Sequence, residues 1–115
     1  MATVSFVGDG SGQSVNGEGV SITATATAGT LIHTYSGAGA DLIKLWAANT
    51  SSASVKLTVE WGGVTAASNI VVNIPAESVV CVADRRSLTG SGKTVAAFAG
   101  TTAVINCWAE VWNAV

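Results

Sequence analysis

Hydrophobic and polar residues alternate along most of this chain. Residues 20–28 read Val-Ser-Ile-Thr-Ala-Thr-Ala-Thr-Ala, with apolar side chains at every second position and hydroxyl side chains between them. Residues 55–61 and 104–112 alternate in the same way. Because successive side chains of a β-strand point to opposite faces, a period of two is typical of strands with one buried face. We therefore predict a half-buried strand in each of these three segments.

Six further segments are rich in apolar and β-branched residues and are mostly separated by glycine, serine or asparagine. The strands expected there span residues 3–7, 30–35, 42–48, 69–74, 79–83 and 94–99. The apolar residues of 42–48 could also line a helix, but the predicted strands on both sides favour a strand. No segment of helical length repeats with a period of 3.6, so we expect little or no helix.

Eight or nine short strands at close spacing predict an all-β fold, namely an antiparallel β-sandwich of jelly-roll-like form. Two sheets that each carry one apolar face can bury those faces against each other. We assign residues 20–115 to this β-sandwich domain. Residues 1–19 are assigned to an N-terminal strand or arm and a glycine-rich loop, since residues 8–19 hold five of the 13 glycines.

The composition excludes several classes of protein. Apolar residues make up 49% of the chain and charged residues only 10%, against about 25% charged in ordinary soluble domains, so the chain is not intrinsically disordered. A net charge of −2 gives no positive surface for a nucleic-acid backbone. No run approaches the ~20 apolar residues of a membrane helix. We expect neither nucleic acid nor a membrane as a partner.

The low charge raises the question of how the surface interacts with water. Either serine, threonine and asparagine supply its polarity, or partners cover much of it, because surfaces usually carry about 25–35% charged residues. The first residues lack the basic and apolar regions of a secretory signal, so synthesis in the cytosol is expected.

Short motifs that suggest chemistry are incomplete. Residues 89–94, Thr-Gly-Ser-Gly-Lys-Thr, copy the second half of a phosphate-binding loop, but the first glycine is missing and a strand is predicted where the motif needs a helix. We expect a glycine-rich hairpin loop with a solvated lysine. Asp9 lies in a glycine loop without enough oxygen ligands nearby for calcium. We therefore expect no metal ion and no cofactor.

No catalytic constellation is evident either. His33, the single histidine, lies in a predicted strand, and no spacing links it to a nucleophile and an orienting acid. Cys81 and Cys107 are expected to be reduced thiols in the core, although a disulfide between their strands is geometrically possible. We therefore expect that the protein is not an enzyme.

The four tryptophans are more informative. Trp108 and Trp112 share one face of the last strand, opposite Ile105, Cys107, Ala109 and Val111, so both faces of that strand are largely apolar. Three explanations stay open: a central strand covered by a loop or by the N-terminal segment, a subunit interface with tryptophan anchors, or a platform for sugar stacking.

The pair Arg85 and Arg86 is the only cationic cluster and follows Asp84 in a predicted loop. It is either a solvated loop tip or a polar contact to an acidic partner surface.

Residues 45–51, 55–63, 95–99 and 104–106 resemble small virion proteins of tailed bacteriophages. The likeness covers roughly residues 30–106 and lies in the pattern of strands and turns. It implies a capsid decoration (cement) protein, a non-enzymatic component of the virion that binds the major capsid protein on the capsid surface and bridges capsomers. It also implies a homodimer or homotrimer, made in the cytoplasm of a bacterial host.

In such a protein we expect Trp108 and Trp112 as interface anchors and Arg85 and Arg86 as polar contacts. The alternatives are another virion component, such as a tail, neck or head fibre, and a carbohydrate-binding β-sandwich that uses exposed tryptophans.

Overall fold

The computed structural model describes residues 4–8 and 18–114. Within these residues the chain forms nine strands and one short 3-10 turn, η1 (Ala66–Ser68). The predicted all-β class is confirmed. The strands are β1 (Val4–Gly8), β2 (Val20–Ser21), β3 (Thr30–Thr34), β4 (Ala40–Asn49), β5 (Val55–Trp61), β6 (Asn69–Ile74), β7 (Val79–Leu88), β8 (Thr94–Ala99) and β9 (Ile105–Ala114).

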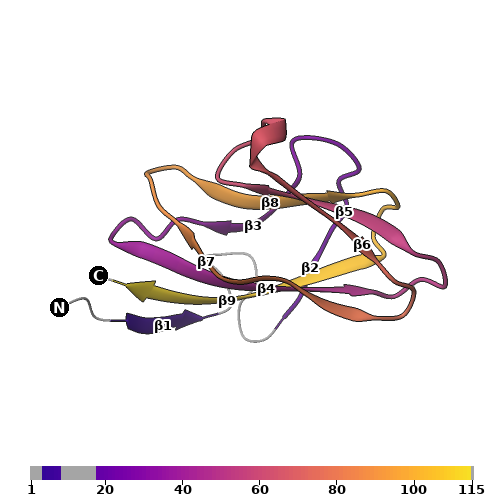
Figure 1. Cartoon of the computed structure of the whole chain (residues 1–115), viewed down its shortest axis with the longest axis horizontal. Coiled ribbons are helices and arrows are strands. Elements are labelled where there is room, and N and C mark those ends of the chain that lie inside the picture. The colour runs from indigo at the N-terminus through magenta and orange to yellow at the C-terminus, as the bar shows by residue number, and fades with distance from the viewer. Residues whose placement is uncertain (1–3, 9–17, 115) are drawn as a thin grey trace.

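The strands pair in two antiparallel sheets, which Figure 1 shows as upper and lower layers. Sheet A has the order β1-β9-β4-β7, with β2 also pairing with β9, and sheet B has the order β3-β8-β5-β6. The pairing is nested: β1 with β9, β3 with β8, β4 with β7, and β5 with β6. Nested pairs folded into two facing sheets give the connectivity of a jelly roll, as the sequence predicted.

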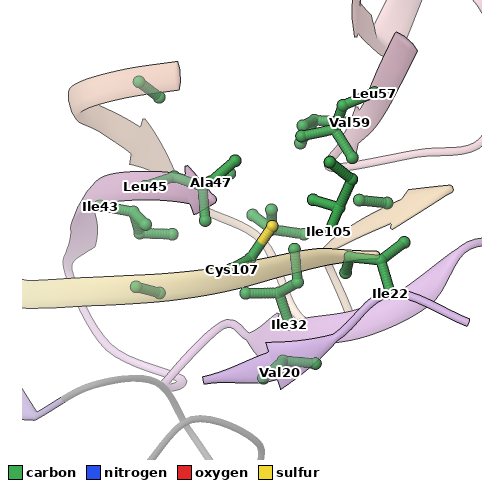
Figure 2. Packing of buried hydrophobic residues seen from close by; sticks show 14 of the residues in the cluster. Val20, Ile22, Ile32, Ile43, Leu45, Ala47, Leu57, Val59, Ile105 and Cys107 are labelled. Carbon is green, nitrogen blue, oxygen red and sulfur yellow. The ribbon is translucent and has the colours of Figure 1, made fainter. Parts of the chain in front are cut away.

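The core lies between the two sheets, where inward side chains from both layers meet (Figure 2). Sheet A contributes Leu45 and Cys107, and sheet B contributes Ile32 and Leu57, all fully buried. Along β4 and β9 buried and partly exposed residues alternate without interruption. The alternation of apolar and polar residues in the sequence therefore corresponds to an inner and an outer face of each of these strands.

The prediction of one strand over residues 20–28 is wrong. Val20 and Ser21 pair with β9, and the Ile22 N–H still donates to the Ile105 carbonyl at 2.8 Å. The chain then leaves sheet A, and the Ala24 carbonyl accepts from the Ala99 N–H of sheet B. The buried carboxylate of Glu60 accepts hydrogen bonds from the Gly29 N–H, at 2.6 Å, and from the Thr27 hydroxyl. Alanines alternating with threonines bury little apolar surface, so this segment serves as the crossover between the sheets.

Several strand boundaries agree with the prediction, and one difference affects a candidate site. Strands β5, β6 and β8 have the predicted bounds, whereas β7 continues to Leu88. Arg85 and Arg86 therefore lie within a strand and not in a loop. β1 pairs with the end of β9, while residues 9–17 lie outside the described residues, so the division into 1–19 and 20–115 stays a prediction.

Candidate functional site

The outer face of sheet A gathers three of the four tryptophans. In the register of β4 and β9, Trp46 lies opposite Trp108, and Trp112 lies opposite Leu42. All three indoles are partly exposed, whereas the positions between them point into the core. We call the surface formed by Trp46, Trp108, Trp112, Lys44 and Glu110 the tryptophan face. As predicted, Trp108 and Trp112 share one side of β9.

Charged side chains hold the Trp46 end of this face. Lys44 and Glu110 lie directly opposite each other on β4 and β9, an arrangement in which opposite charges stabilise neighbouring strands. The Trp46 Nε1–H donates to Glu110 Oε2 at 3.2 Å, and Lys44 Nζ lies 5.2 Å from the centre of the Trp46 ring. The indole is therefore fixed by an acid and a base, within the reach of a cation–π contact.

A β-bulge brings Arg85 to the other end of the face. Asp84 and Arg85 together lie opposite the single residue Lys44, since Ile43 pairs with Arg86 and Leu45 with Ala83. Arg85 has a positive φ of 52°. Bulges of this kind redirect side chains, and here the Arg85 guanidinium reaches across β4 to lie 4.4 Å from the centre of the Trp112 ring.

The chain before β2 lies against Trp108. A Cβ added at Gly19 would come within 2.8 Å of two carbons of the Trp108 ring, so the absence of a side chain permits this close approach. Trp108 is thus partly covered from the N-terminal side and still partly exposed. Of the explanations left open by the sequence, cover by the N-terminal segment holds in part, since residue 19 packs against the Trp108 ring.

Arg86 belongs to a different place. Its guanidinium lies 5.6 Å from the centre of the Trp61 ring, and Trp61 donates from Nε1 to the Ser87 carbonyl at 2.9 Å. Together these residues link the end of β5 to β7, across the open side of the sandwich. Beside them runs a groove of about 390 Å³ that is lined by Ile70, Val82, Ala83, Asp84 and Arg86. Three of the four predicted interface residues therefore lie at the tryptophan face, and Arg86 does not.

The two cysteines are free, but their environments differ. Cys107 is fully buried, and burial raises the pKa of its thiol to about 12. Cys81 is exposed on the outer side of β7, next to Trp46 in the register. The expectation that both are core thiols is correct for Cys107 and wrong for Cys81.

A polar cluster joins the buried side chains of His33 and Asp41 to the exposed Ser36. His33 Nε2 lies 2.7 Å from Asp41 Oδ2, and the Ser36 hydroxyl donates to Asp41 Oδ1 at 2.5 Å. In a hydrolytic triad the histidine lies between the serine and the acid, whereas here the acid lies between them. Asn113 Nδ2 also donates to Asp41 Oδ1, at 3.0 Å. The cluster ties together β3, β4 and β9.

Asp41 is held in its charged form by these donors. Burial on its own raises the pKa of Asp41, but the hydrogen bonds from Ser36, His33 and Asn113 outweigh it and lower the pKa below the ordinary 3.8. A carboxylate this well satisfied is a structural acceptor. The sequence reasoning found no link between His33 and Asp41, because the turn between β3 and β4 creates it.

The loop that resembles half a phosphate-binding motif joins β7 of sheet A to β8 of sheet B, so it is not a hairpin within one sheet. The Lys93 N–H bonds to the Gly90 carbonyl, and strand β8 begins at Thr94 where the motif needs a helix. Lys93 is exposed, as expected.

Across the described residues, no three His, Cys, Asp or Glu side chains gather as a metal site. Residues 4–8 and 18–114 also contain no helix long and apolar enough to cross a membrane. Comparison with models of protein families, with curated proteins and with solved structures finds no match to this chain.

Proposed function

We propose that this protein is a non-enzymatic structural component of a bacteriophage particle, a capsid decoration protein that binds the major capsid protein on the outer capsid surface. The observation that carries the proposal is the tryptophan face. It places Trp46, Trp108 and Trp112 on one side of sheet A, with charged side chains between and beside them. The sequence resemblance to small virion proteins supplies the class of partner.

The composition of this face suits a protein partner. Tryptophan and arginine are enriched at the energetic centres of interfaces. Trp112 with Arg85 stacked above it offers a broad amphipathic anchor, and Glu110 with Lys44 offers one charge of each sign. Standard interfaces bury about 1,600 Å² in total. Repeated over a shell, contacts that exist only in the assembled state stabilise that state by linkage.

The proposal is tested with capsids that lack this protein. Purified protein should bind them and raise the fraction that survives heat or osmotic shock. Trp108→Ala and Trp112→Ala should each weaken binding by about thirtyfold, since truncating an interface anchor costs about 2 kcal/mol. Val64→Ala is the matched control, because Val64 is 57% exposed and lies outside sheet A. Thermal unfolding of each variant checks that the fold is retained.

Absence of binding to capsids, together with unchanged survival, would refute the proposal. Binding that the two tryptophan variants leave unchanged would move the interface away from the tryptophan face. Images of decorated particles separate a capsid role from a tail, neck or head-fibre role by the position of the added density.

A carbohydrate-binding module is the second candidate, and one observation favours it. The tryptophan face presents three partly exposed indoles on one side of sheet A, and jelly-roll sandwiches also occur among lectin domains. A glycan array distinguishes the two candidates. Glycan binding that disappears in Trp108→Ala and Trp112→Ala, without binding to capsids, would replace the first candidate by the second.

A further inference from the structure

The edge strands of the two sheets are not equally protected against pairing with another chain. Within the described residues, the ladders of β1, β3 and β7 are each interrupted by a register shift, and β2 is only two residues long. Strand β6, the edge of sheet B, pairs with β5 over Asn69–Ile74 in unbroken register. Bulges and very short strands are means by which proteins protect sheet edges, and β6 has neither.

The composition of β6 also lacks protection. Its sequence, Asn-Ile-Val-Val-Asn-Ile, contains no charge and no proline, the two residue classes that usually block an edge. Val71 is 56% exposed at its centre. Its neighbour β7, by contrast, carries Asp84, Arg85 and Arg86. An uncharged, regular and partly apolar edge is a template for a further strand.

The residue pattern of β6 fits a second copy of itself. Antiparallel pairing about Val71 sets Val71 opposite Val71 of the second copy. It also sets Asn69 opposite Asn73, and Ile70 opposite Val72. The asparagines and Val71 lie on the outer side of sheet B, while Ile70 and Val72 pack toward the core. In this register valine meets valine and asparagine meets asparagine on the outer face, and isoleucine meets valine on the inner face. Pairs of β-branched side chains stabilise neighbouring strands.

The surroundings of the strand are compatible with this partner. The inward side of the β6 edge adjoins the groove in which Ile70, Val82 and Ala83 lie beside two charged side chains, so inward side chains of an added strand would meet both apolar and polar surface. The groove is flanked by Asp84 and Arg86, one charge of each sign, and two copies related by a two-fold axis bring no excess of like charge together.

We propose that β6 is a homodimerisation edge, at which two copies of this chain pair their β6 strands antiparallel about a two-fold axis at Val71 and join their B sheets into one. This surface lies on the sheet opposite to the tryptophan face, so the inference goes beyond the proposed function. Dimers paired in this way carry two tryptophan faces, which suits a protein that bridges neighbouring subunits.

The first test measures the association of the full chain by sedimentation velocity over a wide range of concentrations. A monomer–dimer equilibrium is expected. Val71→Lys sets two ammonium groups opposite each other and should raise the dimer dissociation constant at least about tenfold. Val79→Lys, at a residue 64% exposed on sheet A, is the matched control and should leave the constant unchanged. Thermal unfolding verifies that both variants fold.

The second test reads the register. In a Cys81→Ser background, which removes the exposed thiol, Val71→Cys should form a disulfide-linked dimer under mild oxidation. Residues directly opposite in an antiparallel pair have Cβ atoms about 4.5–5.5 Å apart, close to the separation that a disulfide requires. Asn69→Cys and Asn73→Cys should each cross-link poorly alone and well when mixed in equal amounts.

Either of two results would overturn the proposal. One is a chain that stays monomeric up to millimolar concentration, or whose association Val71→Lys does not change. The other is a Val71→Cys variant that cross-links no faster than Asn73→Cys alone, which would exclude the two-fold register. Because neither experiment uses capsids, both outcomes are independent of the proposed virion role.

Discussion

Asp41→Asn is the substitution for which the structure predicts the most specific response. Asp41 is fully buried and accepts four hydrogen bonds. Two of them come from Ser36, through its backbone N–H and its hydroxyl, and the others come from His33 and Asn113. An asparagine has the same shape as the aspartate but only one oxygen, so it replaces one acceptor atom by an NH₂ donor.

Neither orientation of the new amide satisfies all of these donors. With its NH₂ at the Oδ2 position, the amide faces the Ser36 N–H, which can only donate. With its NH₂ at the Oδ1 position, it faces the Asn113 amide nitrogen, whose orientation is fixed by a second bond to the Ala38 carbonyl at 2.8 Å. A donor left without an acceptor costs about 1–3 kcal/mol, with the lower value for the Ser36 N–H, because Ser36 itself is exposed. For a domain of this size that corresponds to a fall in Tm of about 4–12 °C.

The loss should depend on pH in a definite direction. The pKa of Asp41 is lower in the folded state than its ordinary 3.8, so the folded state favours the charged carboxylate. Its stabilisation is therefore fully present above the unfolded pKa and is lost as the pH falls through the folded pKa. Urea unfolding of both proteins between pH 5 and pH 2 should show a difference in unfolding free energy that narrows below about pH 4.

A difference that stays constant below pH 4 would refute this account, because it would mean that Asp41 has the same pKa in both states. Asp84→Asn is the matched control. Asp84 is an exposed aspartate on β7, and its substitution should change the unfolding free energy by less than about 0.5 kcal/mol.

Three further predictions concern packing, the crossover and the thiols. Gly29→Ala should destabilise the fold by about 1–3 kcal/mol in urea unfolding. The added Cβ would lie 2.5 Å from the Ala97 carbonyl carbon, and the backbone there cannot move aside easily. An unchanged unfolding midpoint would contradict this prediction. Glu60→Ala removes the acceptor of the Gly29 N–H and should speed amide hydrogen exchange there, with little effect at β9. A thiol reagent at pH 8 should modify Cys81 alone in the native chain, because burial raises the pKa of Cys107 to about 12, and mass spectrometry should show two modifications only after denaturation.

The strand pattern was predictable because apolar and polar residues alternate wherever a strand has one face in the core. β5 and β6 have the predicted ends, and both are bounded by residues such as glycine, serine and proline that interrupt strands. The same rule failed for residues 20–28. Their alternation is regular, but alanine buries little surface, and the need to cross from sheet A to sheet B decides the path of the chain.

The two side-chain arrangements that sequence reasoning missed have signals that are visible in retrospect. Asp41 and Asn113 occupy inward positions of β4 and β9, where the alternation expects apolar residues, and they lie directly opposite each other. A polar residue at a core position requires a polar partner. At Asp84 and Arg85 two charged residues interrupt the alternation of β7 and mark the bulge. Neither signal identifies the partner residue. Asn113 is distant in sequence from Asp41, and Trp112 is distant from Arg85, so only the strand register brings each pair together.

The low charge of the chain has two different structural counterparts. In the crossover, threonine hydroxyls provide surface polarity without charge, since most of residues 23–28 are exposed. On sheet A the few charged side chains contact the tryptophans. Lys44 and Glu110 contact Trp46, and Arg85 contacts Trp112. Strand β6 has neither threonine hydroxyls nor charged side chains, and its Val71 is exposed. A surface held by charge–indole contacts suits a partner with mixed polar and apolar chemistry, whereas an uncharged strand edge suits backbone pairing. The proposed capsid contact therefore uses side chains of sheet A, and the proposed dimer uses backbone pairing at the edge of sheet B. One chain can take part in both at once.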